Sequence, residues 1–312
     1  MKIPASAPTA ALLLGASLWG VVWYPYRLLA AAGIDGIWAT VATYGVALVA
    51  GIAIFPREAL RLARAPRLAI VMALAIGWSN LAYVLGVLQG EVMRVLLLFY
   101  LAPLWTVPLA RLLLAERLDR GGFAVMALAF AGAMAMLWKP ELGAPWPTTR
   151  AEWLGLAAGF LFALGNVLIR RLDTMTDAGK SIAIWAGVTF AGAVHLPMSA
   201  VPAAAAASAI AAKAGLVAAI GLALVAMSLA LQYGLARMPA TRAIVILLFE
   251  LVVAAVAAYV LAGEVLRPRD GLGAALIVAA SVASGWMNAK PKPKPKPKRG
   301  SDPEPNNGNT RV

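Results

Sequence analysis

The sequence has no cysteine and only one histidine, His195, among its 312 residues. Without cysteine there is no disulfide framework, no thiolate metal site and no cysteine nucleophile, and one histidine excludes a multi-histidine metal centre. We therefore expect no cofactor and no bound metal. Charged residues are also scarce, at 13%, whereas apolar residues make up 62%. A soluble domain is about 45–50% apolar and about 25% charged, so the composition excludes a soluble globular protein.

Motifs for catalysis and for nucleic-acid binding are also missing. An intramembrane serine protease requires a Gly-x-Ser-Gly run, and the nearest run, 282–285 (Val-Ala-Ser-Gly), lacks the first glycine. His195 has no carboxylate at helical spacing, and the sequence contains no phosphate-binding loop. The net charge of +13 lies between apolar runs, which fits anionic lipid headgroups better than nucleic acid. We predict that the chain is not an enzyme and binds no nucleic acid.

Long apolar runs dominate the sequence. A membrane-spanning helix needs about 20 mostly apolar residues, and these runs lack the alternation of barrel strands. The alanine-rich stretch 203–212 could extend either of two neighbouring runs. The pattern predicts an all-α integral membrane protein with ten transmembrane helices, at 10–31, 36–54, 68–88, 92–114, 121–138, 152–170, 181–200, 215–236, 241–263 and 271–289.

The Lys and Arg residues between the runs and near their ends, with Arg94 and Arg242 left out, predict the orientation. With the N-terminus inside, the cytoplasmic segments hold 12 of them against 6 outside, and the C-terminal tail raises the first number to 19. We therefore predict a multi-pass protein of the bacterial inner membrane with both termini in the cytoplasm. The tail, 290–312, opens with alternating Lys and Pro, which favours an extended chain. We expect it to contact anionic lipid headgroups as a topology anchor; a regulatory lipid or partner site is the alternative.

The two halves of the sequence share residues at an offset of 148. The matching pairs are Glu116 with Glu264, Arg94 with Arg242, Gly86 with Gly234, and Trp138 with Trp286. We infer a duplication, with a first five-helix repeat at 1–150 and a second at 151–289. Five is an odd number, so the second repeat must enter the membrane from the opposite face. Transporters built from two inverted repeats hold their substrate near the midplane between them.

Several motifs occur in a characteristic order: Leu18-Trp19-Gly20, Leu101-Ala102-Pro103-Leu104, the Leu-Ala-Glu-Arg-Leu run ending at Leu118, Leu247-Leu248-Phe249-Glu250 and Ala262-Gly263-Glu264. Over about residues 9–289 the sequence thereby resembles the drug/metabolite transporter superfamily, EamA type. The resemblance implies ten helices in two inverted halves, a cavity lined mainly by helices one, three, four, six, eight and nine, and export of small metabolites, often amino acids. The aromatic-rich first helix resembles the aromatic amino-acid exporter branch. Two positions depart from the family: Leu251 stands where it often has proline, and Ala115 where it often has glycine.

Glu250 is the most distinctive candidate for a binding residue. It lies nine residues into the ninth run, close to mid-membrane, where a charged side chain costs about 2.5–3.5 kcal/mol. We predict a cavity carboxylate that contacts a substrate ammonium group or takes a proton. The alternative is a neutral, hydrogen-bonded packing residue.

Other polar and aromatic residues lie inside the runs. Buried amides need hydrogen-bond partners, which a substrate or a neighbouring helix can supply. Aromatic rings can hold an apolar or aromatic side chain by stacking, although packing is the simpler role for most of them. The predicted substrate-binding set is Trp19, Trp23, Trp78, Asn80, Tyr83, Tyr100, Asn166, Gln232 and Glu250.

Four residues are candidates for gating. Pro25 and Pro103 remove backbone donors and can act as hinges. Arg94 and Arg242 occupy the same position in the two repeats, near opposite faces of the membrane; Glu91 is spaced to pair with Arg94, and Arg242 has no acidic partner in its own helix. For both arginines the alternative is snorkelling to the lipid headgroups.

Together these features predict a secondary transporter that moves small organic solutes across the inner membrane by alternating access. We expect an exporter of amino acids, aromatic or large apolar ones first. A non-transporting structural or receptor-type membrane protein is the alternative. The sequence carries no prediction of the oligomeric state.

Overall fold

The computed structural model describes residues 6–90, 92–116, 118–138, 146–263 and 267–289. Within these ranges the regular structure is helical, with no strand. Nine helical segments of the described chain are long and apolar enough to cross a membrane. These findings confirm an all-helical, multi-pass membrane protein. The tenth predicted span forms a 22-residue helix that is not among those nine.

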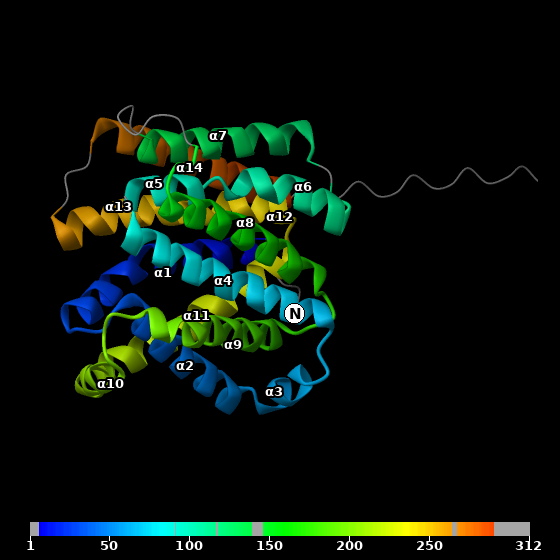
Figure 1. Cartoon of the computed structure of the whole chain (residues 1–312). Helices are drawn as coiled ribbons and strands as arrows, with labels where there is room; N and C mark the ends of the chain where they lie inside the picture. The colour runs from blue at the N-terminus through cyan, green and yellow to red at the C-terminus, as the bar shows by residue number, and fades with distance from the viewer. Residues whose placement is uncertain (1–5, 91, 117, 139–145, 264–266, 290–312) are drawn as a thin grey trace, which may run out of the picture.

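The helices are numbered as in Figure 1. The helices that precede position 150 are α1 (Ala7–Ala31), α2 (Gly36–Ile54), α3 (Pro56–Leu62), α4 (Arg67–Gln89), α5 (Val92–Phe99), α6 (Ala102–Leu114) and α7 (Arg120–Leu137). Those that follow are α8 (Arg150–Arg171), α9 (Asp177–His195), α10 (Ala203–Ala212), α11 (Ala214–Arg237), α12 (Ala240–Leu247), α13 (Phe249–Ala262) and α14 (Pro268–Ala289). The alanine-rich stretch is thus a helix of its own, α10.

Two predicted spans, 92–114 and 241–263, are each divided into two helices. α5 and α6 are separated at Tyr100 and Leu101, and α12 and α13 at Leu248. Pro103 lies in the first turn of α6, where its missing N–H removes no helical hydrogen bond. The second break has no proline, so the departure at Leu251 does not prevent it.

Short polar side chains fix where several spans begin. Asp35 accepts the backbone N–H of Trp38 at the start of α2, and Thr176 accepts that of Gly179 at the start of α9. Such N-caps contribute typically about 1 kcal/mol because they satisfy a donor that the first turn leaves unpaired. The spans therefore begin at residues that stop a helix from extending into the connection.

The helices of the two halves correspond in order, and α4 to α7 begin within one residue of α11 to α14 at an offset of 148. Adding 148 to the ends of α5 gives the ends of α12, and the same offset relates the starts of α7 and α14. Each half also packs its third span against the first span of the other half. α4 packs against α8, and its counterpart α11 packs against α1. In Figure 1, α7 and α14 lie together along one edge of the bundle, and α2, α3 and α10 along the opposite edge.

A polar contact between the second and third spans occurs in both halves. The Asn80 side-chain amide donates to the Tyr44 hydroxyl at 3.5 Å, and the Trp185 indole N–H donates to the Ser228 hydroxyl at 2.9 Å. Asn80 and Ser228 are 148 residues apart in the sequence. Each contact joins two helices of the same half, so it stabilises the half as a unit.

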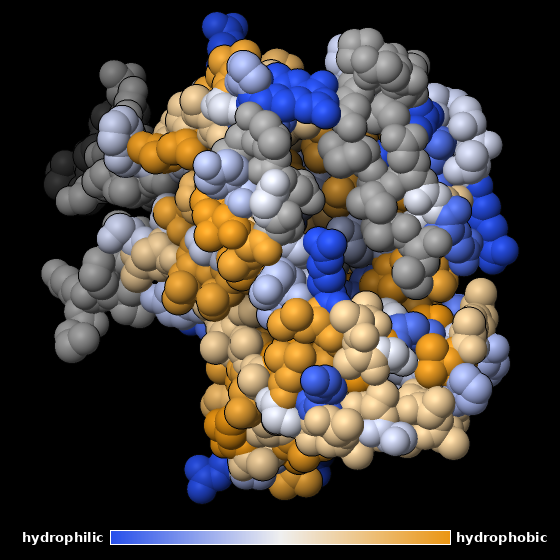
Figure 2. Space-filling model, turned by 90° about the vertical axis from the view of Figure 1, so that its left-hand side faces the viewer, coloured by the Kyte–Doolittle hydropathy of each residue, from blue (hydrophilic) through white to orange (hydrophobic). Residues whose placement is uncertain are grey.

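Large apolar side chains are exposed along the outer helices. Leu112, Phe123 and Val260 are 79%, 65% and 68% exposed. A water-soluble protein rarely presents large contiguous apolar patches, whereas lipid makes such exposure favourable. Figure 2 views the left-hand end of the bundle in Figure 1, where hydrophilic side chains are scattered among the apolar ones. Trp146 and Trp153 stack edge to face at 6.1 Å, as interfacial indoles can.

Candidate functional site

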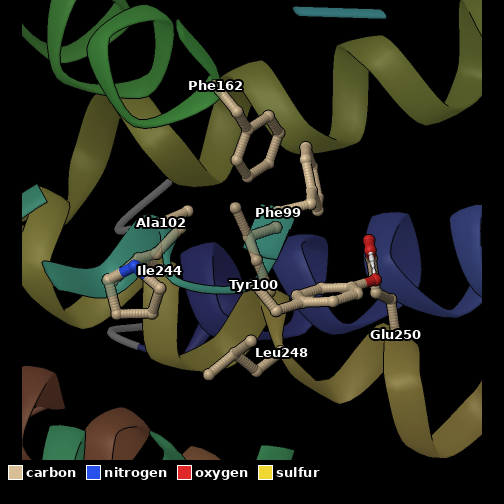
Figure 3. A pocket seen from close by; sticks show the side chains of 9 residues that line it. Phe99, Tyr100, Ala102, Phe162, Ile244, Leu248 and Glu250 are labelled. Atoms are coloured by element: carbon tan, nitrogen blue, oxygen red, sulfur yellow. Dashed lines mark hydrogen bonds between the residues drawn. The ribbon is translucent and has the colours of Figure 1, made fainter. Parts of the chain in front are cut away.

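The two divided spans meet at their breaks. A small cavity lies between them, and Phe162 of α8 closes one side of it (Figure 3). Its size is about that of a single water molecule, so it is too small for an organic solute in this structure. The cavity is lined by Phe99, Tyr100, Ala102, Pro103, Phe162, Ile244, Leu247, Leu248 and Glu250.

A hydrogen bond joins the two breaks across this cavity. The Tyr100 hydroxyl donates to Oε1 of Glu250, and both side chains are buried, at 9% and 8% exposure. Tyr100 follows α5 directly, and Glu250 is the second residue of α13. Tyr100 lies at the break after α5, where its N–H still donates to the Leu96 carbonyl at 2.9 Å, and Glu250 at the start of α13 lies opposite its hydroxyl (Figure 3). The carboxylate therefore lies at the middle of the span Ala240–Leu261.

Aromatic rings surround the tyrosine. The Phe99 ring lies 5.1 Å from that of Tyr100 and 5.4 Å from that of Phe162, between ring centroids. The ring of Tyr83, in α4, also contacts Phe99, with 5.3 Å between the ring centroids. These are normal separations for interacting aromatic pairs. The structure thus brings together four predicted site residues: Tyr83, Tyr100, Pro103 and Glu250.

Trp78 and Asn80 have different neighbours. The Trp78 ring contacts those of Phe190 and His195 in α9, at 6.1 and 6.0 Å. Asn80 contacts Tyr44, and its Oδ1 has no hydrogen-bond partner among the described residues. Neither residue lines the cavity beside Glu250.

The remaining predicted binding residues are spread along the bundle. Asn166 and Gln232 are 4% and 3% exposed, and each has one side-chain polar atom without a partner in the described chain. Trp19 is half-buried against the main core, and Trp23 contacts Tyr24 edge to face at 5.7 Å. Pro25 lies inside α1 without ending it.

Arg94 connects the two halves at one end of the bundle. Its Nε lies 2.7 Å from Oε1 of Glu152 in α8, and its Nη2 donates to the Trp146 carbonyl at 2.8 Å. Glu152 also accepts the Thr148 N–H at 2.6 Å. The pairing expected from sequence was with Glu91, which lies outside the described residues. The sequence did not indicate Glu152, because a carboxylate in the first turn of a helix is ordinary capping chemistry.

At the other end, Glu116 also links the halves. Its Oε2 accepts the Ala240 N–H at the start of α12 at 3.0 Å, and its Oε1 lies 3.7 Å from Nε of Arg170. Burial raises the pKa of Glu116, and the Ala240 N–H and Arg170 oppose that shift. Arg242 donates to the Met287 carbonyl at 2.9 Å. Glu264, the repeat partner of Glu116, lies outside the described residues.

Metal ligands do not gather in the described part of the chain. No group of three or more His, Cys, Asp or Glu side chains there could hold an ion. The chemistry on offer at the site is thus one carboxylate, one phenol and an apolar, aromatic wall.

Residues 149–285 match the EamA-like transporter family. With the apolar helices, this match indicates a membrane transporter of the drug/metabolite transporter type. The family is normally non-enzymatic, in agreement with the prediction that the chain is not an enzyme. No curated protein matches the chain.

A solved structure described only as "Crystal structure of protein" has a similar fold. The two superpose with a TM-score of 0.71 over 91% of this chain and 99% of the other, at 17% sequence identity. At that identity the likeness concerns the fold alone.

Proposed function

We propose that the protein is a secondary transporter that carries small organic solutes across the bacterial inner membrane by alternating access. The observation that carries the proposal is the Tyr100–Glu250 hydrogen bond, which joins two divided spans at mid-membrane. Discontinuous helices with polar groups at their breaks are typical of transporter binding sites. A purely structural protein has no need to place a carboxylate there at a cost of about 2.5–3.5 kcal/mol.

The proposal includes two inverted repeats, 1–150 and 151–289. The matching bounds of α5 and α12, and the exchanged packing of α4 with α8 and α11 with α1, support it. Two similar halves can exchange conformations, so the cavity would open first to one side and then to the other. The contacts of Arg94 with Glu152 and of Glu116 with Arg170 then serve as closures at the two ends.

The substrates proposed first are amino acids with aromatic or large apolar side chains, moved outward. The rings of Phe99, Tyr100 and Phe162 support an apolar or aromatic substrate group, and Glu250 supports an ammonium group. The proposal also includes both termini in the cytoplasm, with the tail at 290–312 against anionic lipids. A receptor-type or structural membrane protein is the alternative, and no contact among the described residues favours it.

Counterflow in proteoliposomes tests the proposal. Purified protein is reconstituted with an excess of unlabelled solute inside, and uptake of labelled amino acids, nucleotide sugars and cationic drugs is measured. A carrier gives a transient, saturable accumulation that Glu250→Gln reduces at least about tenfold, because the loss of one charge-assisted contact costs about 1.5–3 kcal/mol. If no solute shows counterflow, the protein is not a carrier of these classes and the alternative stands.

A further inference from the structure

The charge environment of Glu250 allows the substrate class to be narrowed. This inference rests on the proposed function. Glu250 lies 92% buried at the cavity, and Tyr100 donates to its Oε1. Among the described residues no ion pair involves it. A buried carboxylate without a cation is costly to ionise, so an incoming cation would gain a strong contact there.

The other buried carboxylate that joins the halves is arranged differently. Glu152, 5% exposed, is held by Arg94 at 2.7 Å and by the Thr148 N–H. Its charge is therefore compensated within the protein. Near Glu250 the cavity wall supplies rings and aliphatic side chains in place of a guanidinium. A positively charged substrate can supply the counter-charge that Glu250 lacks.

The aromatic wall complements a cation. Phe99 and Phe162 line the cavity with Tyr100, and the centroid of the Phe99 ring lies 5.1 Å from that of Tyr100 and 5.4 Å from that of Phe162. An ammonium group within about 6 Å of a ring centroid is attracted by the ring face. The same rings stack on an aromatic substrate group. One wall can therefore hold both ends of an arylalkyl ammonium ion.

The cavity has little to offer a substrate carboxylate. Among the described residues that line it, Tyr100 is the only side-chain hydrogen-bond donor, and that donor is already directed at Glu250. A second carboxylate would stand beside the first, and like charges at short range repel strongly in a low dielectric. An amino acid would satisfy Glu250 with its ammonium group and be opposed there by its carboxylate.

We propose that the preferred substrate is a protonated arylalkyl amine without a carboxylate. The closed cavity is too small for such a molecule, so binding requires the two divided spans to separate. Breaking the Tyr100–Glu250 hydrogen bond frees the carboxylate for the amine at that step. An ammonium ion thus replaces the tyrosine hydroxyl as the partner of Glu250.

The experiment compares three indole compounds as competitors of counterflow: tryptamine, tryptophan and 3-indolepropionate. They share the ring and differ in their charged groups. Preloaded proteoliposomes take up labelled tryptamine, and each compound is titrated outside at pH 7. We expect tryptamine to compete at a concentration at least about tenfold lower than tryptophan, a difference of about 1.4 kcal/mol. We expect 3-indolepropionate not to compete.

Two variants locate the effect. Glu250→Gln should abolish tryptamine counterflow, and Tyr100→Phe should retain it with an altered apparent affinity, because the carboxylate remains. Glu58→Gln, in α3 and outside the cavity, is the matched control for loss of a carboxylate and should transport as the parent does. Thermal unfolding in detergent checks that each variant folds; if Glu250→Gln does not, Glu250→Asp should shift the apparent affinity.

The outcomes separate the two proposals. If tryptophan is carried and competes as well as tryptamine or better, the site recognises a carboxylate; the amine inference is then wrong while the transporter remains. The inference also fails if tryptamine counterflow is unchanged in Glu250→Gln. If none of the labelled solutes shows counterflow, the proposed function itself fails.

Discussion

Arg94 and Glu152 form a largely buried ion pair across the two halves, with Nε and Oε1 2.7 Å apart and both side chains at most 12% exposed. They lie 58 residues apart in sequence, in α5 and α8. At the opposite end Glu116 contacts Arg170 and the start of α12. At each end a carboxylate of one half thus contacts a basic residue of the other half.

Breaking the first pair should open one end of the protein. Arg94→Gln leaves the Glu152 carboxylate buried without its cation, which costs about 3–5 kcal/mol, so the closed conformation becomes less favourable. The chain has no cysteine, so Ala102→Cys gives a single reporter at the cavity. We expect faster labelling of this cysteine by a membrane-impermeant maleimide when Arg94→Gln is added, from the side that bears Glu152.

The control for that experiment is a double variant in which both members of the ion pair are uncharged. Arg94→Gln with Glu152→Gln removes both charges, and labelling should fall back toward the parent rate because no unpaired charge drives the halves apart. Equal labelling in the parent and in Arg94→Gln would show that this pair is structural and does not close the site.

The pH dependence of stability should contain a contribution from Glu116. Burial raises the pKa of this carboxyl above its ordinary 4.5, and the N–H of Ala240 and the Arg170 guanidinium only partly offset the shift. The folded chain therefore takes up a proton at Glu116 at a higher pH than the unfolded chain does. Its contribution to stability decreases as the pH rises through the raised pKa. Thermal unfolding midpoints measured from pH 4 upward should show a flatter profile in Glu116→Gln, and parallel profiles would contradict this assignment.

The contact between α1 and α13 should be intolerant of added volume. A Cβ at Gly20 would lie 2.7 Å from the carbonyl oxygen of Glu250 and 2.9 Å from Cβ of Val253. Gly20→Ala must therefore displace the start of α13, and overpacking of this kind costs about 1–3 kcal/mol. We expect a lower unfolding temperature and reduced counterflow. Gly45→Ala is the matched control, since a Cβ at that helical position meets nothing within 4 Å.

The apolar pattern predicted most of the helices but not the breaks. The predicted run 36–54 has the same bounds as α2, because Asp35 marks its start and apolar residues fill it. The divisions at Tyr100 and Leu248 lie in continuous apolar sequence, where hydropathy does not distinguish one helix from two. Hydropathy alone therefore does not locate the two breaks.

The sequence singled out the polar residues of the candidate site but not the phenylalanines that line its cavity. Glu250 and Tyr100 stand out as polar groups in apolar runs, but their contact joins residues 150 positions apart. Phe99 and Phe162 line the cavity without any sequence signal, since phenylalanine in a membrane helix is ordinary packing. Trp78, like Tyr100, is an aromatic residue inside an apolar run. Its ring contacts Phe190 in α9, and it does not line the cavity.

Ala115 occupies a backbone conformation that favours glycine. Its φ is +54° at the end of α6, and Gly263, 148 residues later, has φ +68° at the end of α13. The left-handed conformation costs an L-residue with a Cβ about 1–2 kcal/mol. The departure noted in the sequence, alanine in place of glycine, is therefore a strained position. Ala115 is exposed, so replacing it loses little packing.

We therefore expect Ala115→Gly to stabilise the folded protein by about 1 kcal/mol, partly offset by the greater freedom of glycine in the unfolded chain. Gly263→Ala is the reciprocal variant: a Cβ there meets nothing within 4 Å, so only the backbone strain is added and stability should fall by a similar amount. The two free-energy changes, measured by reversible denaturation in mixed micelles, should have opposite signs. Destabilisation by both variants would show that the two turns are not equivalent.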